Sequence, residues 1–200
     1  MERSLFLTYS SIHVYLAGSI FYYGDVLRNK EWANKIRVAF PGISLYSPIE
    51  NTDINGTEGK KKFAGARQIA RADNTRLDHT NILIVCLDGD VIPAGSACEI
   101  GRMSKIIEDQ GGLIIGICTD NRQCYLTHST AKDSGGAAEL GEQQYSYQNL
   151  YVTGVIKESG GTMVSSIEEA IEQMKEWIRH NSLISEERIE ELSKDGNDKD

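Results

Sequence analysis

The sequence predicts an α/β protein in which helices cover both faces of a central, mostly parallel β-sheet. Three observations lead to this prediction. Residues 81–87 (NILIVCL) and 113–119 (LIIGICT) are almost continuously apolar, as strands covered on both faces are. Segments with helical periodicity alternate with the predicted strands along the chain. Alternating strands and helices build parallel sheets sandwiched between two helical layers.

The first half of the chain divides into predicted elements at its glycines and prolines. A β-branched run over 12–17 ends at Gly18 and predicts the first strand. Asp25 then precedes a helix over 26–40, whose apolar residues share one face and which the Pro41-Gly42 pair ends. The other elements predicted in this half are a strand over 43–47, a polar, glycine-rich loop over 50–62 and a helix over 63–80.

The second half begins with the apolar strand over 81–87 and a helix over 96–112. The apolar residues of that helix recur at helical spacing, and Gly111 and Gly112 end it. The remaining predictions are the strand over 113–119, a long loop over 119–148, a last strand over 149–156 (NLYVTGVI) and a helix over 167–178 that begins with a Ser166–Glu169 capping box. A charged tail over 181–200, partly helical or disordered, follows a single domain over 1–180.

Composition narrows the classes of partner. The formal net charge of −8 argues against a nucleic-acid binder and gives no support for docking on anionic lipid, so a small neutral or cationic ligand fits better. No segment is long and apolar enough to span a bilayer. The four cysteines and four histidines show no metal-ligand spacing, and we expect no metal and no other cofactor. Reduced core thiols and the lack of a secretory leader pattern indicate a cytoplasmic protein.

Two segments that follow predicted strands are candidates to line one pocket, because ligands of open α/β sheets bind beyond the carboxyl ends of the strands. These are residues 15–19 (YLAGS) and 87–99 (LDGDVIPAGSACE). The first has a glycine turn but lacks the pattern of a phosphate-binding loop, so its glycine has an equal claim to a purely structural role.

Glu99 has two interpretations that the local pattern leaves open. Ser96 and Glu99 match the S-x-x-E capping box, in which the glutamate only returns a hydrogen bond to the backbone. A carboxylate in the first turn of a helix is also held in its ionised form by the helix dipole, which a nucleophile at neutral pH requires.

Other candidates have equally ordinary explanations when they are considered alone. Tyr15 lies in a strand, where most tyrosines are packing residues. Asp73 and Asp78 lie on a helix, where exposed acids are commonly solvated. Asp88 and Asp90 resemble turn acids.

The motifs taken together resemble the nucleoside 2-deoxyribosyltransferase family. They are VYLAGSIF near the start, SPIEN after the second strand, LDG followed by GSACEIG after the central strand, and QNLYVTGV near the end. The resemblance covers most of residues 13–178 and leaves the tail outside. It implies a flavodoxin-like, three-layer sandwich that exchanges the base of 2′-deoxyribonucleosides with free nucleobases, without a cofactor.

The resemblance also assigns roles by motif position. Glu99 would attack C1′ and hold the deoxyribose as a covalent ester, Tyr15 would orient that carboxylate, and Asp73 would exchange a proton with the base. Asn149 would bind the sugar in a neighbouring subunit's site, which implies a homo-oligomer. The other substrate-binding residues expected from the resemblance are Gly18, Ser19, Glu50, Asn51, Asp88, Gly95 and Ser96.

One departure from the family pattern keeps alternatives open. Many members carry an acid shortly before the G-[ST]-x-x-E core, and this chain has Pro93 there. An N-glycosidase that releases free base to water, or a nucleoside-binding or sensor module with weakened turnover, therefore stands beside the transferase. Phosphate-bearing substrates would need basic contacts, for which the sequence offers Arg76 and the glycine loop, so nucleosides are favoured.

Overall fold

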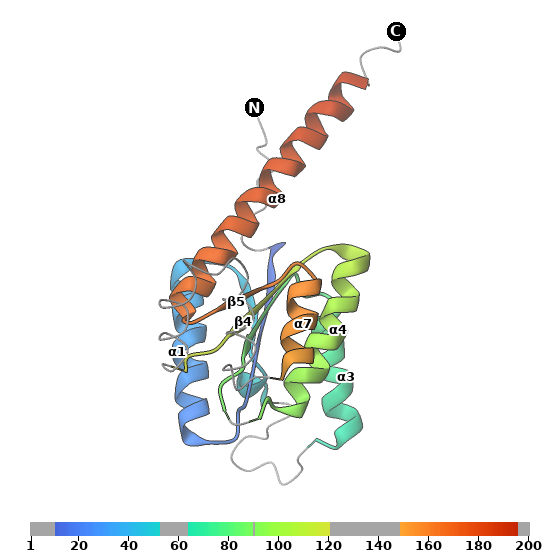
Figure 1. Ribbon diagram of the computed structural model, residues 1–200. Coiled ribbons are helices and arrows are strands. Elements are labelled where there is room, and N and C mark those ends of the chain that lie inside the picture. The colour runs from blue at the N-terminus through green and yellow to red at the C-terminus, as the bar shows by residue number, and fades with distance from the viewer. Residues whose placement is uncertain (1–10, 53–63, 90, 121–148, 196–200) are drawn as a thin grey trace, which may run out of the picture.

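The computed structural model describes residues 11–52, 64–89, 91–120 and 149–195, with side chains as far as Asn181. Most of the loop predicted over 119–148 and most of that over 50–62 therefore lie outside the described residues. Within these ranges the fold is an α/β sandwich, as the sequence predicts (Figure 1). No helix in these ranges combines the length and apolar character needed to cross a bilayer.

The central sheet is parallel at every described strand pair. Its strands are β1 (His13–Ala17), β2 (Ser44–Tyr46), β3 (Ile82–Cys86), β4 (Leu113–Ile117) and β5 (Thr162–Val164). Their order, β2-β1-β3-β4-β5, is that of flavodoxin-like folds. The order reverses between β1 and β3, and ligands of such sheets bind at that point.

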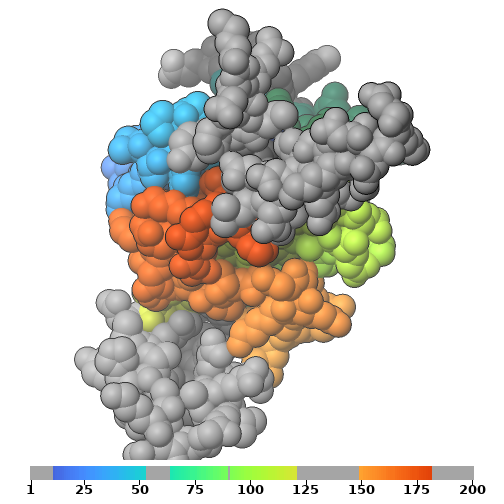
Figure 2. All heavy atoms as spheres, turned by 90° about the horizontal axis from the view of Figure 1, so that it is seen from above, coloured from blue at the N-terminus to red at the C-terminus, as the bar shows by residue number. Residues whose placement is uncertain are grey.

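The described helices are α1 (Tyr23–Ala39), α3 (Ala66–Leu77), α4 (Ala94–Gln110), α7 (Leu150–Glu158) and α8 (Ile167–Asp195), with a short 3₁₀ turn, η2 (Pro48–Glu50). Among them, α1 and α8 cover one face of the sheet, and α3, α4 and α7 cover the other (Figure 1). Seen from above, α1 (blue) lies beside α8 (red-orange), and α4 (lime) lies beside α7 (orange) (Figure 2).

Strict alternation along the inner strands separates two hydrophobic cores. In β1, Val14 and Leu16 pack toward α1 and α8, whereas Tyr15 and Ala17 pack toward α3, α4 and α7. β3 alternates in the same way and is buried along its whole length. The two faces of each strand therefore carry different tasks: one packs the α1–α8 layer and the other supports the layer that contains Asp73 and Glu99.

The strand predicted over 149–156 is wrong, because these residues form α7. The Asn149 side chain accepts hydrogen bonds from the backbone N–H groups of Tyr151 and Val152, which caps the helix. Val152, Val155 and Ile156 then fall on one helical face and pack into the core beneath α3 and α4. The last strand is instead the short β5, which the sequence analysis did not identify.

Several helix ends also differ from the predictions. α1 begins at Tyr23, because Asp25 accepts the Tyr22 backbone N–H from inside the first turn rather than preceding the helix. At the start of α8, Ser166 accepts the Glu169 N–H as predicted, while the Glu169 carboxylate bonds Ser165. α8 continues to Asp195, well beyond the predicted end at residue 178.

Candidate active site

The side chains of Tyr15 and Glu99 meet on the face of the sheet that α3 and α4 cover. The Tyr15 hydroxyl donates a hydrogen bond of 2.6 Å to Glu99 Oε1. Tyr15 is fully buried at the middle of β1, so its ring is fixed by the core around it. A phenol has one proton to donate, and this one is directed at the carboxylate.

The capping-box interpretation of Glu99 is wrong. α4 begins at Ala94 with Pro93 as its N-cap residue, and no side chain caps it. Pro93 has a φ of −55° and an extended ψ of 131°, so it sets the helix start ahead of Ser96. Ser96 is buried inside the first turn, and Glu99 lies one turn further along, where it faces Tyr15.

Removal from water raises the pKa of Glu99 to about 7. The Tyr15 hydrogen bond opposes this rise, and the negative charge of Asp73 adds to it. The helix N-terminus was predicted to favour ionised Glu99, but α4 begins at Ala94, Glu99 lies beyond its first turn, and burial instead raises the pKa. Burial, followed by the charge of Glu99, raises the pKa of Tyr15, so Tyr15 remains a proton donor in the hydrogen bond.

Asp73 lies on α3 and belongs to the same cluster. Tyr46, the last residue of β2, donates a hydrogen bond of 3.1 Å from its hydroxyl to Asp73 Oδ1. The Tyr46 oxygen in turn accepts a hydrogen bond of 3.0 Å from Asn51 Nδ2. Burial raises the pKa of Asp73, and the hydroxyls of Tyr46 and Tyr15 act in the opposite direction. Two carboxyl groups of raised pKa thus share one site, each with a tyrosine hydroxyl.

Tyr46 is the site residue that the sequence analysis missed. It is the register partner of Tyr15 in the neighbouring strand, and the two ring centroids are 5.0 Å apart. The Arg76 guanidinium lies 5.2 Å above the Tyr46 ring centroid. The available signal was the position of Tyr46 near the carboxyl end of the strand predicted over 43–47. A lone strand tyrosine more often packs, so this signal was weak.

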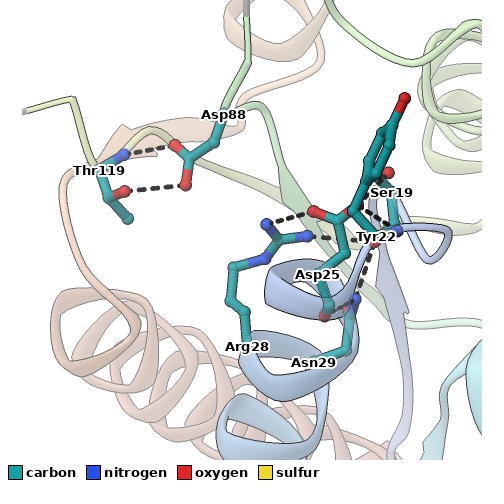
Figure 3. A network of polar contacts seen from close by, with 7 residues as sticks. All are labelled: Ser19, Tyr22, Asp25, Arg28, Asn29, Asp88 and Thr119. Atoms are coloured by element: carbon teal, nitrogen blue, oxygen red, sulfur yellow. Dashed lines mark hydrogen bonds and ion pairs between the residues drawn. The ribbon is translucent and has the colours of Figure 1, made fainter.

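The loop from β1 to α1 carries Gly18 and Ser19, and a polar network holds it (Figure 3). Gly18 has a φ of 141°, and a Cβ there would lie 2.9 Å from Cys86 Cβ, so only glycine fits. The Ser19 carbonyl accepts hydrogen bonds from Arg28 and Asn29 of α1, and its hydroxyl donates to Asp25. These bonds fix the loop at the carboxyl end of β1, beside the candidate site.

Asp88 lies at the end of β3 and is engaged by the protein itself. Its two carboxylate oxygens accept hydrogen bonds of 2.6 and 2.8 Å from the backbone N–H and hydroxyl of Thr119, which follows β4 (Figure 3). Asp88 therefore connects the segments that follow β3 and β4. Its expected contact with substrate stays a prediction.

The other expected residues fall into two groups. Asn51 joins the cluster through Tyr46, and buried Ser96 lies one turn before Glu99 on α4. Glu50, by contrast, forms a salt bridge of 2.6 Å with Arg37 of α1, and exposed Asn149 caps α7. Asp90 lies outside the described residues.

No group of three or more potential metal ligands occurs among the residues that the structure describes. The donors of the cluster are two tyrosine hydroxyls directed at carboxylates and the Asn51 amide, which donates to the Tyr46 oxygen. Such an arrangement can hold one carboxylate as a nucleophile and another as a proton carrier.

Comparison with known proteins identifies the family to which the chain belongs. A sequence profile described as Nucleoside 2-deoxyribosyltransferase matches residues 14–174. Among solved structures, a conserved protein from Enterococcus faecalis V583 is 31% identical, covers 82% of this chain and 98% of its own, and has a TM-score of 0.63.

Two further solved structures are more distant. A 2-desoxiribosyltransferase from Leishmania mexicana is 18% identical, over 55% of this chain and 65% of its own, with a TM-score of 0.40. The CMP N-glycosidase BcmB of Clostridium botulinum is 13% identical, over 82% and 98%, with a TM-score of 0.41. A search of curated proteins finds no match. The profile match and the Enterococcus relative each span most of the chain, which therefore belongs to the nucleoside 2-deoxyribosyltransferase family.

Proposed function

We propose that this protein transfers 2-deoxyribose between nucleobases through a covalent intermediate on Glu99, with retention of configuration. The observation that carries the proposal is the hydrogen bond of 2.6 Å from Tyr15 to Glu99, formed in a site that also contains Asp73. Family membership supports the choice of a 2-deoxyribonucleoside as substrate.

The reaction has two displacements. In the first, a Glu99 oxygen forms a bond to C1′ while the bond from C1′ to the base nitrogen breaks. The electron pair of that bond stays on the base, which takes a proton from Asp73. In the second, the incoming base nitrogen attacks C1′, its proton passes to Asp73, and the Glu99 carboxylate leaves. Two inversions at C1′ amount to retention.

Each residue has a physical task in the proposed scheme. The transition state resembles an oxocarbenium ion, which a carboxylate against C1′ stabilises by charge. Tyr15 binds one oxygen of Glu99 and leaves the other for C1′. Asp73 has a raised pKa, as a group that must carry a proton near neutral pH should have.

A base-exchange assay with deoxyinosine and adenine tests the proposal. We expect deoxyadenosine and hypoxanthine as products, and roughly a 10³-fold or larger loss in Glu99→Ala, because removal of a covalent nucleophile eliminates the main pathway. Glu158→Ala, an exposed glutamate at the end of α7, is the matched control and should retain activity. Absence of exchange by the wild-type protein would count against the transferase.

Mass spectrometry of the intact protein tests the covalent step directly. Incubation with a 2-fluoro-2-deoxynucleoside should add the mass of the fluorinated sugar at Glu99. The sugar accumulates there if fluorine makes its release in the second displacement slower than its attachment in the first. Tyr15→Phe should be labelled more slowly, since it loses a hydrogen bond to a charged oxygen, worth roughly 1.5–3 kcal/mol. Labelling at a residue other than Glu99 would contradict the mechanism.

The same assay without an acceptor base separates the transferase from an N-glycosidase. If free deoxyribose forms without an acceptor base as fast as nucleoside is exchanged in its presence, the protein is an N-glycosidase that uses water as the acceptor. Thermal stabilisation by deoxynucleosides with no product after long incubation would instead indicate a binding or sensor module.

The proposal extends to the setting of the enzyme. We place it in nucleoside salvage in the cytoplasm, acting on nucleosides and free nucleobases without a cofactor. We also propose a homo-oligomer in which Asn149 contributes to a neighbouring site. Exposed apolar side chains at loop and helix starts beyond the strand ends would suit such an interface, namely those of Phe21, Tyr22, Tyr23, Val91, Leu150 and Tyr151.

A further inference from the structure

We infer that Tyr46 is a positioning residue, which together with Asn51 fixes the orientation of Asp73 for proton transfer to the base. This inference rests on the proposed function for its meaning in catalysis. Its structural core is a directed hydrogen-bond chain that runs from Asn51 to Tyr46 to Asp73.

The direction of the chain follows from what each group can donate. The Asn51 amide nitrogen has only protons to offer, and it donates to the Tyr46 oxygen over 3.0 Å. The single Tyr46 proton is then directed at Asp73 Oδ1, 3.1 Å away. Asp73 Oδ1 is thereby an acceptor, so the proton that Asp73 exchanges with the base belongs on Oδ2. The hydrogen-bond chain thus determines which of the two Asp73 oxygens carries the exchangeable proton.

The surroundings of Tyr46 hold its ring in place. The Tyr15 ring packs against it with centroids 5.0 Å apart at an interplanar angle of 55°. The Arg76 guanidinium covers the ring at 5.2 Å from its centroid, and Arg76 and Asp73 come from the same helix, α3. Burial raises the pKa of Tyr46 to about 12, so Tyr46 keeps its proton throughout the physiological range.

The pairing of Tyr46 with Asp73 parallels that of Tyr15 with Glu99. Tyr15 and Tyr46 are register partners on adjacent strands, and their hydroxyls donate to Glu99 and Asp73, respectively. Tyr15 also lowers the pKa of Asp73, whereas Tyr46 has no contact with the nucleophile among its hydrogen bonds to described residues. The two tyrosines should therefore fail in different ways when their hydroxyls are removed.

Leaving-group dependence tests this difference. Tyr46→Phe keeps the ring and its contacts and removes only the hydroxyl. We expect about a tenfold loss of kcat with deoxyinosine, whose base needs a proton to leave. With 2′-deoxyribosylnicotinamide, whose base leaves as a neutral pyridine, we expect less than about a twofold change. Tyr15→Phe should slow both substrates. Val38→Ala, at an exposed position of α1 away from the site, is the control.

Asn51→Asp tests the direction of the chain. A carboxylate at this position accepts the Tyr46 proton, so Asp73 loses its donor while Tyr46 keeps its hydroxyl. This variant should reproduce the leaving-group selectivity of Tyr46→Phe, and the double variant should lose no more than either single variant. Asn74→Asp adds the same charge at an exposed position of α3 beside Asp73, and it measures the effect of charge alone.

A titration of the Asp73 side-chain carboxyl by ¹³C NMR decides the inference even if the reaction is different. Tyr46→Phe removes a hydrogen bond that lowers the pKa of Asp73, so the titration should move to higher pH, and Asn51→Asp should move it further than Asn74→Asp. An unchanged titration in Tyr46→Phe overturns the inference, as does an equal loss on both leaving groups. If Tyr46→Phe shifts the titration of Asp73 but the wild-type protein exchanges no base, the proposed function is refuted and the inference about Tyr46 stands.

Discussion

Glu99 is placed where its charge is costly, because it lies partly buried beside a second acid. Its pKa rises from 4.5 to about 7, and burial is the largest cause. A glutamate of this kind is partly ionised at neutral pH, and it becomes a better nucleophile as the pH rises. Activity that depends on ionised Glu99 should therefore increase from pH 6 to pH 8.

The same raised pKa lowers the free energy of unfolding as the pH rises from 4.5 to about 7. In the folded state its pKa lies above the unfolded value, so ionisation favours unfolding. The penalty is absent below pH 4.5, grows up to pH 7 and then stays constant, at up to about 3 kcal/mol for the full shift. Glu99→Gln should therefore unfold at a higher temperature than the wild type at pH 8, and at the same temperature at pH 4.

Thermal unfolding by circular dichroism at these two pH values measures the difference. Glu158→Gln provides the control, because Glu158 is exposed at the end of α7. A stabilisation by Glu99→Gln that does not depend on pH would show that packing, rather than the charge, is responsible.

At the scale of elements, Gly161 at the junction between α7 and β5 has the least room for a side chain among the glycines that the structure describes. A Cβ on Gly161 would lie 2.4 Å from the Ile114 carbonyl oxygen and 2.8 Å from that of Ile156. Both atoms belong to backbone, so a side chain here would displace β4 or α7. We expect Gly161→Ala to destabilise the fold by roughly 3 kcal/mol or more.

Chemical denaturation can compare this variant with Gly154→Ala in the interior of α7, where a Cβ would meet nothing within 4 Å. That control should stabilise the protein by about 1 kcal/mol, since glycine is a poor helix former. Equal effects of the two substitutions would contradict the close approach at Gly161.

Asn149 provides a second element-scale prediction, because it caps α7 and also has a proposed role in binding the sugar. Asn149→Ala removes the cap of α7 and should cost about 1 kcal/mol. Asn149→Asp keeps an oxygen that can cap, but it has no amide donor for the sugar. We expect Asn149→Asp to retain stability and to raise KM for the nucleoside. A normal KM in this variant would leave the cap as the only role of Asn149.

At the scale of the whole molecule, α8 has two parts. Its first turns bury Ile167, Ala170, Met174 and Ile178 in the core beside α1, and the rest runs on beyond the body (Figure 1). Deletion of residues 182–200 should therefore leave the unfolding temperature within a few degrees of the full chain, because the deleted part starts after these core residues. A large loss would show that the predicted boundary between domain and tail is misplaced.

The fold was more predictable than its details. The apolar runs of β3 and β4 and the periodic face of α4 are strong local signals, and they suffice for a parallel α/β sandwich. The residues of α7 carry β-branched side chains typical of strands, and the Asn149 cap and packing against α4, β4 and β5 stabilise them as a helix. β5 has three half-buried residues, too few for a periodic pattern.

Three members of the site were predictable from the sequence, whereas Tyr46 and the contacts within the site were not. The resemblance pointed to Glu99, Tyr15 and Asp73, whose catalytic roles stay predictions. No local pattern could show that Tyr15 contacts a residue 84 positions away, because that contact depends on how α4 packs against β1. The raised pKa of Glu99 also depends on this packing, so the helix start alone gave the wrong direction.

The neighbouring acids Glu99 and Asp73 have a consequence for inhibitor design. Each raises the electrostatic cost of the other's ionisation, and both are partly removed from water. A sugar analogue with a protonated ring nitrogen in place of C1′ would neutralise that repulsion, as the oxocarbenium ion does. Such an amine should lower the pKa of Glu99 on binding, and its uptake should release a proton to the buffer near pH 7. The site should therefore bind the protonated analogue more tightly than an uncharged analogue of the same shape.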